Sequence, residues 1–168
     1  MWARVKGMRS YELGTADEMR TRLNRLVLAG RKTASTGLLA VYAEEAEGVE
    51  YPGETLALLD RDGARAALIE VTGVTLTPFA EVTWEHVEAE GEGHASVEEW
   101  RAGHRRYWDR LGTPVDDDTV VVCVAFRLIE GSDSYGPDSY GPDPANPAIT
   151  DPDTSDPDIT DPDITGSA

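Results

Sequence analysis

The chain has 168 residues, enough for one domain, and a formal net charge of −17. The charge is unevenly spread, because residues 131–168 contain nine Asp, seven of the ten prolines and no Lys or Arg. Residues 1–130 carry 23 acidic and 15 basic side chains, a net charge of −8. Binding to long duplex DNA requires many phosphates to be neutralised, so this acidic body argues against that class of partner. A small ligand or a short single strand in a local basic cleft remains compatible with it.

The single cysteine, Cys123, lies in the apolar run 120–126 and cannot form a disulfide within the chain. This fits a reducing compartment, and we expect Cys123 to pack as a small buried side chain. No stretch reaches 18 consecutive apolar residues, and the N-terminus lacks the apolar core of a signal peptide. We therefore expect a cytoplasmic protein without a membrane partner; no pattern indicates its oligomeric state.

The first predicted element is a helix that begins at a capping box of Thr15 and Glu18 and stops at Gly30. Arg20 lies off its apolar stripe and is expected to be solvated. Residues 31–37 then read as a hydroxyl-rich turn. The apolar segment 38–42 fits either a short helix or a strand.

Asp62-Gly63 predicts a hairpin between a strand at 54–61 and a return strand at 66–72, with a possible bulge at Gly73. Two helices follow, one capped by Thr83 and reaching about Glu90, the other opened by Ser96 and Glu99 and reaching about Leu111. The β-branched run 119–129 predicts a central strand. Strands interrupted by helices indicate a small α+β domain, with enough strands for a compact barrel flanked by helices.

From residue 131 the composition changes. Ser-Tyr-Gly-Pro-Asp occurs twice, and Asp-Pro-Asp recurs every five residues from 151. Such a segment has too few apolar residues to form a core. We predict a folded domain at 1–130 and a disordered acidic tail at 131–168.

Lys32 is the first candidate functional residue. Of the fifteen basic residues only Lys6 and Lys32 are lysines, which suggests that position 32 needs an amine. A lysine can act as a base or nucleophile when its surroundings lower its pKa, whereas an arginine cannot. Three hydroxyls stand beside it, from Thr33, Ser35 and Thr36. The alternative is that Arg31 and Lys32 only face the C-terminal carbonyls of the preceding helix.

A second candidate region, residues 85–104, contains several carboxylates and histidines and two closely spaced glycines. Glu88, Glu90 and Glu92 lie within five residues, and His94 and His104 bracket the start of the next helix. A carboxylate, an amine and a hydroxyl that converge in a pocket make a workable hydrolase site. The alternative for Glu90 and Glu92 is a solvated helix end.

These motifs together resemble the ASCH domain, a small β-barrel similar to the RNA-binding PUA domain. The resemblance covers about residues 20–128. It rests on the ordered series Gly30-Arg-Lys-Thr33, Pro52-Gly-Glu54, Leu59-Asp60, Asp62-Gly63, Pro78-Phe79, Glu90-Gly-Glu-Gly-His94, Ser96, Trp100-Arg101 and His104.

The resemblance implies an activity, because some ASCH proteins resemble amidohydrolases that remove the acyl group of N4-acetylcytidine. It implies catalytic roles for Lys32 and Glu90, with Ser35 at the hydroxyl position and Thr36 next to it. On this hypothesis Lys32 activates Ser35 for attack, while Glu90 orients the lysine or protonates the leaving amine. This chain departs from the longer family type at His94, where Asp is usual.

The remaining expectations concern binding. The expected substrate-binding residues are Arg31, Thr33, Thr36, Glu92, His94, Arg101 and His104. We expect neither a metal nor a cofactor, and a small nucleoside or single-stranded RNA as the partner. The alternatives are a single-stranded RNA-binding module, a metal-dependent ribonuclease, and a pocket that binds a ligand without catalysis.

Overall fold

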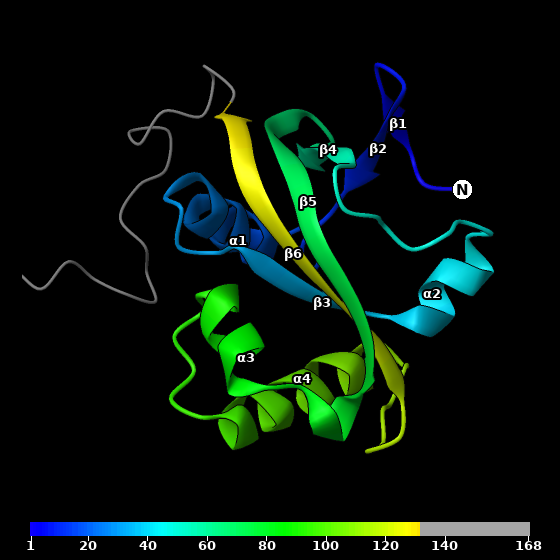
Figure 1. The fold of residues 1–168 in the computed structure, drawn as a ribbon, viewed down its shortest axis with the longest axis vertical. Helices are drawn as coiled ribbons and strands as arrows, with labels where there is room; N and C mark the ends of the chain where they lie inside the picture. Colours follow the sequence, from blue (N-terminus) through cyan, green and yellow to red (C-terminus); the bar gives the residue numbers. More distant parts are fainter. Residues whose placement is uncertain (132–168) are drawn as a thin grey trace, which may run out of the picture.

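The computed structural model describes residues 1–131 (Figure 1). The strands of this part of the chain are β1 (Arg4–Val5), β2 (Met8–Tyr11), β3 (Ala34–Leu38), β4 (Thr55–Leu59), β5 (Arg65–Pro78) and β6 (Val120–Gly131). Its helices are α1 (Glu18–Leu28), α2 (Leu39–Glu44), the short η1 (Phe79–Glu81), α3 (Trp84–Glu90) and α4 (Val97–Arg110). The predicted acidic tail lies outside the described residues, apart from Gly131 at the end of β6.

The described strands form one mixed sheet in the order β1-β2-β4-β5-β6-β3. Neighbouring strands are antiparallel, except for the parallel pair β2 and β4. Three strands separate β2 from β3 in this order, yet residues of both line the same pocket. The sheet therefore curls into an incomplete barrel, flanked by helices (Figure 1). This confirms the expected α+β class.

Strand β6 supplies side chains to two hydrophobic cores. Val122 and Val124 pack in the core beneath α1, whereas Val121 and Cys123 pack in the core against α3 and α4. Successive side chains of a strand point to opposite faces, so both faces of β6 are buried. This explains why its sequence is continuously apolar rather than alternating, and it confirms the predicted central strand.

The predicted hairpin is also present. Asp60 Oδ1 accepts the backbone N–H groups of Asp62 and Ala64, and Gly63 adopts a left-handed φ of 81° in the turn between β4 and β5. The pairing of β5 with β6 shifts register between Val71 and Gly73, which confirms the predicted bulge.

Two predictions about the first helix were wrong. Its N-cap is Asp17, whose carboxylate accepts the N–H of Met19, while the Thr15 hydroxyl donates to Asp17. Arg20 is only 6% exposed rather than solvated. Its guanidinium donates to the carbonyls of Leu13 and Gly14, which hold the chain entering α1. A long side chain can thus be buried off the apolar stripe when backbone carbonyls satisfy its donors.

The segment predicted as a turn at 31–37 contains a strand. Residues Ala34–Leu38 form β3, which pairs with β6 with Ser35 opposite Val124 and Thr36 opposite Cys123. The following apolar residues form the short helix α2. The two helices beyond the hairpin begin at the predicted caps, Thr83 and Ser96. No helix among residues 1–131 is long and apolar enough to cross a membrane.

Candidate active site

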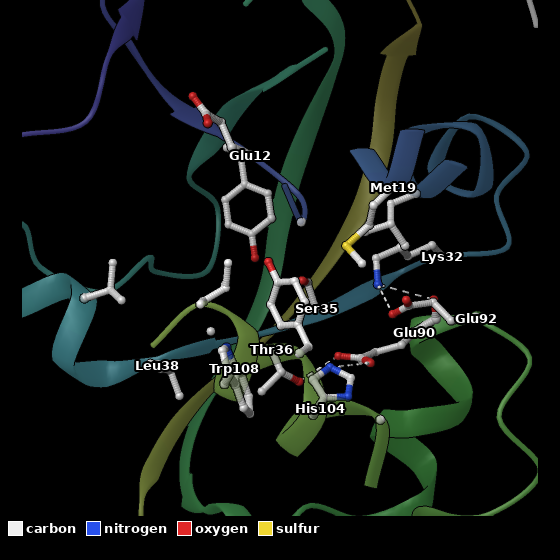
Figure 2. Close-up of a pocket in the computed structure, with 18 of the residues that line it drawn as sticks. Glu12, Met19, Lys32, Ser35, Thr36, Leu38, Glu90, Glu92, His104 and Trp108 are labelled. Carbon is white, nitrogen blue, oxygen red and sulfur yellow. Dashed lines mark hydrogen bonds and ion pairs between the residues drawn. The ribbon is translucent and has the colours of Figure 1, made fainter. Parts of the chain in front are cut away.

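A pocket of about 730 Å³ opens beside β3. Its walls come from β2, α1, β3, α2, the loop after α3, and α4. Figure 2 shows Lys32, Glu90 and Glu92 gathered on one side of it, with Ser35 and Thr36 on the β3 wall and His104 and Trp108 from α4. Its volume is typical of small-molecule sites.

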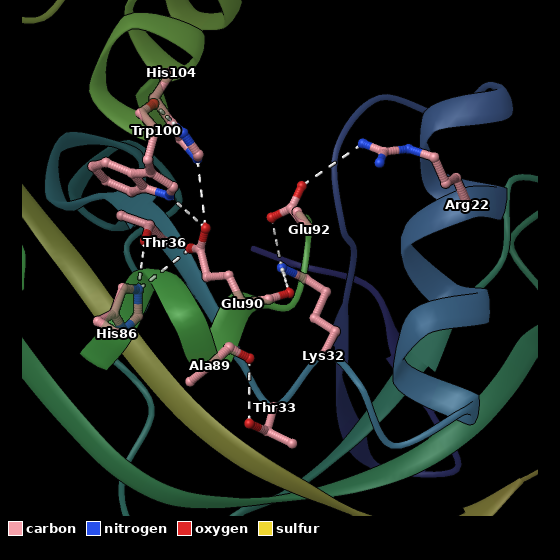
Figure 3. Close-up of polar contacts among 10 residues, drawn as sticks. All are labelled: Arg22, Lys32, Thr33, Thr36, His86, Ala89, Glu90, Glu92, Trp100 and His104. Atoms are coloured by element: carbon pink, nitrogen blue, oxygen red, sulfur yellow. Dashed lines mark hydrogen bonds and ion pairs between the residues drawn. The ribbon is translucent and has the colours of Figure 1, made fainter. Parts of the chain in front are cut away.

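Lys32 is buried, with an exposed fraction of only 2%. Its Nζ lies 2.9 Å from Glu92 Oε2 and 3.4 Å from the carbonyl oxygen of Glu90 (Figure 3). Glu92 also lies 3.8 Å from the guanidinium of Arg22 on α1. A buried ion is costly without a partner, and Glu92 is the carboxylate that balances this amine.

The Glu90 carboxylate, 1% exposed, faces away from Lys32 toward a ring of donors. The Thr36 hydroxyl donates to Oε1 and the Trp100 indole to Oε2, each at 2.6 Å. Burial alone would raise the pKa of Glu90, but the hydrogen bond from His86 and the charge of Lys32 outweigh it. Its pKa therefore lies well below the usual range, and the group is ionised at neutral pH.

The Thr36 hydroxyl also contacts His86. Its Nε2 lies 2.7 Å from Thr36 Oγ1 and 3.3 Å from Glu90 Oε1, one helical turn away on α3. Burial lowers the pKa of His86, but its bonds with Cys123 and Glu90 raise it to about 9 overall. The protonated ring donates to Thr36 while Thr36 donates to Glu90, so the hydroxyl hydrogen points at the carboxylate.

His104 has a different protonation state. Its Nδ1 donates to the Trp100 carbonyl oxygen at 3.0 Å, and its ring stacks on the indole with centroids 4.1 Å apart. Burial holds the pKa of His104 below its usual value despite the nearby charge of Glu90. The neutral ring therefore carries its lone pair on Nε2, which lies 3.9 Å from Glu90 Oε2.

Gly91 allows the end of α3, which carries Glu90, to lie against the segment that carries Lys32. It ends α3 in a left-handed conformation with φ of 65°. A Cβ at this position would lie 2.0 Å from the carbonyl oxygen of Arg31, so only glycine allows this approach. The contact is reinforced by Thr33, whose N–H and hydroxyl both donate to the carbonyl oxygen of Ala89.

Similarity to known proteins identifies the family of the chain. The family model described as ASCH domain matches residues 9–130. The chain belongs to the ASCH domain family. Its fold is similar to that of protein EF3133 from Enterococcus faecalis V583, with 28% identity over 71% of this chain and 75% of that chain and a TM-score of 0.64. It is also similar to an ASCH domain from Lactobacillus crispatus JV V101, with 24% identity over 74% of this chain and 83% of that chain and a TM-score of 0.63. No curated protein sequence matches the chain.

The pocket of this ASCH domain contains seven of the residues singled out in the sequence: Lys32, Ser35, Thr36, Glu90, Glu92, His94 and His104. The other three lie elsewhere. Arg31 is exposed beyond α1, Thr33 bonds Ala89, and Arg101 donates to the carbonyl oxygens of Ala80 and Val82. Within residues 1–131 no group of three or more His, Cys, Asp and Glu side chains is placed to hold a metal ion.

Sequence reasoning missed His86. The available signal was its position four residues before Glu90 on a predicted helix, which places both side chains on one helical face. It also missed Tyr11, whose phenol is bonded by the Ser35 hydroxyl. Burial, followed by the charge of Glu50, raises the pKa of Tyr11, so its phenol stays protonated.

The raised pKa of His86 predicts a pH dependence of stability. The ordinary value of 6.5 applies to the unfolded chain and about 9 to the folded one. The stabilisation is therefore complete below pH 6.5 and is lost as the pH rises through about 9. We expect the free energy of unfolding to fall by up to about 3 kcal/mol across this window, measured by urea unfolding. The His86→Gln variant should show a flatter profile, and equal slopes for both proteins would contradict the assignment.

Proposed function

We propose that this ASCH domain hydrolyses the amide of a small acylated nucleoside of the N4-acylcytidine class. The observation that carries the proposal is the convergence of a buried amine, a buried carboxylate and a hydroxyl in one pocket. Lys32, Thr36 and Glu90 come from three different segments, and Thr36 donates to Glu90 at 2.6 Å. A nucleophile hydrogen-bonded to a base is the arrangement that acyl transfer requires.

The geometry favours Thr36 over Ser35 as the nucleophile. The two side chains leave β3 on opposite faces, and only the Thr36 hydroxyl bonds Glu90, whereas Ser35 bonds Tyr11. In the proposed reaction Thr36 Oγ1 attacks the acyl carbon while its proton moves along the existing hydrogen bond to Glu90, which is too weak a base to retain it. Glu90 then passes this proton to the leaving cytidine nitrogen. Water hydrolyses the resulting Thr36 ester and regenerates the hydroxyl.

Lys32 has a different role in this scheme from the one expected from the sequence. Glu92 holds the amine at 2.9 Å, and in the proposed reaction Lys32 stabilises the oxyanion of the tetrahedral intermediate. The carboxylate that orients Lys32 is that of Glu92, because Glu90 contacts it through its backbone oxygen.

A small substrate fits the charges better than an RNA strand does. Two arginines of α4 that could face phosphates already contact the protein, Arg101 through backbone carbonyls and Arg105 through Asp117 and the face of Phe79. A neutral nucleoside needs no attractive field, and residues 1–130 carry a net charge of −8. Binding to single-stranded RNA would instead depend steeply on salt concentration.

Hydrolysis of N4-acetylcytidine, followed by chromatography, tests the proposal. The wild type should release cytidine and acetate, and Lys32→Met should lower kcat by about 100-fold, as loss of one oxyanion donor does elsewhere. Lys6→Ala removes the other lysine, which is exposed outside the pocket, and should leave turnover unchanged. No turnover by the wild type would reject this substrate and redirect the test to binding and cleavage of single-stranded RNA.

A further inference from the structure

The pocket contains a second polar cluster that the proposed reaction does not use. It consists of Tyr11 on β2, Tyr42 on α2 and Glu50 in the segment before β4, and all three line the pocket. The Tyr42 hydroxyl donates to Glu50 Oε2 at 2.7 Å. Tyr11 bonds Ser35 and is close enough to Glu50 for their charges to interact.

The two clusters follow one another along β3, with Tyr11 beside Ser35 between them. Lys32 precedes the strand, whereas Tyr42 belongs to the helix that follows it. The four steps from Ala34 to Leu38 span about 13 Å at the usual rise of a strand. The pocket therefore extends from the Lys32 and Glu90 end to the Glu50 and Tyr42 end, a length that suits an elongated ligand.

Glu50 is a buried acidic residue, which is unusual in a protein interior. It is 3% exposed, and burial is the main cause that raises the pKa of its carboxyl group. Arg9 pairs with Glu54 and donates to the Gly48 carbonyl, and its charge, the bond from Tyr42 and a backbone hydrogen bond offset only part of the effect of burial on the pKa of Glu50. A buried carboxyl group costs stability, and a glutamine would accept the bond from Tyr42 equally well. The bond from Tyr42 therefore does not by itself require a carboxylate here, while a ligand that offers hydroxyl donors would use one.

We infer that Glu50 and Tyr42, beside Tyr11, form a subsite that binds the vicinal 2′- and 3′-hydroxyls of a ribose. The inference rests on the proposed function. In an N4-acylated cytidine the reacting nitrogen and the glycosidic nitrogen lie on opposite sides of the ring. With the amide at Thr36 and Lys32, a ring aligned with β3 would direct the sugar toward Glu50. Two adjacent hydroxyls supply two donors, and carboxylates bind ribose hydroxyls in this way in nucleotide-binding proteins.

Equilibrium binding of cytidine, 2′-deoxycytidine and 2′,3′-dideoxycytidine tests the subsite without requiring turnover. Trp2 and Trp108 line the pocket, so their fluorescence reports occupancy. We expect affinity to fall by about tenfold for each hydroxyl removed. In Glu50→Gln the three ligands should bind within about twofold of one another. The matched control Glu44→Gln changes an exposed residue of α2 outside the pocket and should keep the wild-type series.

The outcomes separate this inference from the proposed function. Dideoxycytidine binding as tightly as cytidine to the wild type would overturn the subsite, whatever the folding of any variant. An intact hydroxyl preference in Glu50→Gln would overturn the role of Glu50. A hydroxyl preference that disappears in Glu50→Gln, without hydrolysis of N4-acetylcytidine, would support the subsite and refute the hydrolase. No binding of any of the three nucleosides would overturn the subsite, whereas the hydrolase is decided separately by turnover of N4-acetylcytidine.

Discussion

Gly91→Ala should lower the free energy of unfolding by at least about 3 kcal/mol, because two costs coincide at this residue. The left-handed conformation disfavours any residue with a Cβ by about 1–2 kcal/mol. The added Cβ would also lie 2.0 Å from the Arg31 carbonyl oxygen, a backbone atom that cannot rotate away. The loop after α3 must then separate from the segment that carries Lys32, so the variant should also lose the contact between Lys32 and Glu92.

Gly112→Ala is the matched control for this prediction. Gly112 follows α4 with a φ of 75°, and a Cβ there would meet nothing within 4 Å. Urea unfolding of both variants isolates the cost of the clash, because the conformational cost is common to them. Equal destabilisation of the two proteins would show that the approach of Gly91 to Arg31 is not held rigidly.

Local sequence signals predicted the elements that local physics determines. Asp62-Gly63 specified the hairpin because that pair suits a tight turn, and Thr83 and Ser96 marked helix starts through hydrogen bonds to nearby N–H groups. The β-branched run 119–129 indicated a central strand, which is β6. The grouping of Lys32 and Glu90 in one site came instead from the resemblance to the ASCH domain family, and the match over residues 9–130 confirms that family.

Two of the predictions that failed depended on contacts that local composition does not show. Residues 34–38 are rich in small polar side chains and suggest a turn, but pairing with β6 makes them a strand. That pairing determines which hydroxyl faces α3, and a one-residue difference reverses the answer. Arg20 is buried because carbonyls of the preceding segment fold back onto it. Neither the register of β3 nor the path of that segment can be read from local composition.

The alternation along β3 gives the sharpest prediction for the proposed reaction. Thr36→Ala should lower kcat on N4-acetylcytidine by at least about 10⁴-fold, because it removes the nucleophile that Glu90 deprotonates. Ser35→Ala should lower it by less than about tenfold, since Ser35 contacts Tyr11 on the other face of the strand.

Thr36→Ser tests whether the hydroxyl or the packing of Thr36 is what turnover requires. It keeps the hydroxyl between His86 and Glu90 but removes the methyl group, so it should retain kcat within about tenfold of the wild type while losing some stability. Steady-state kinetics and thermal melting of the three variants should be measured together. The decisive readout is kcat of the folded proteins. If Thr36 mattered only for packing, both Thr36→Ser and Thr36→Ala would have a lower melting temperature, and the serine variant would have no advantage in turnover. A larger loss of kcat in Ser35→Ala than in Thr36→Ala would assign the nucleophile to Ser35, and the hydroxyl bonded to Glu90 would then only position the carboxylate.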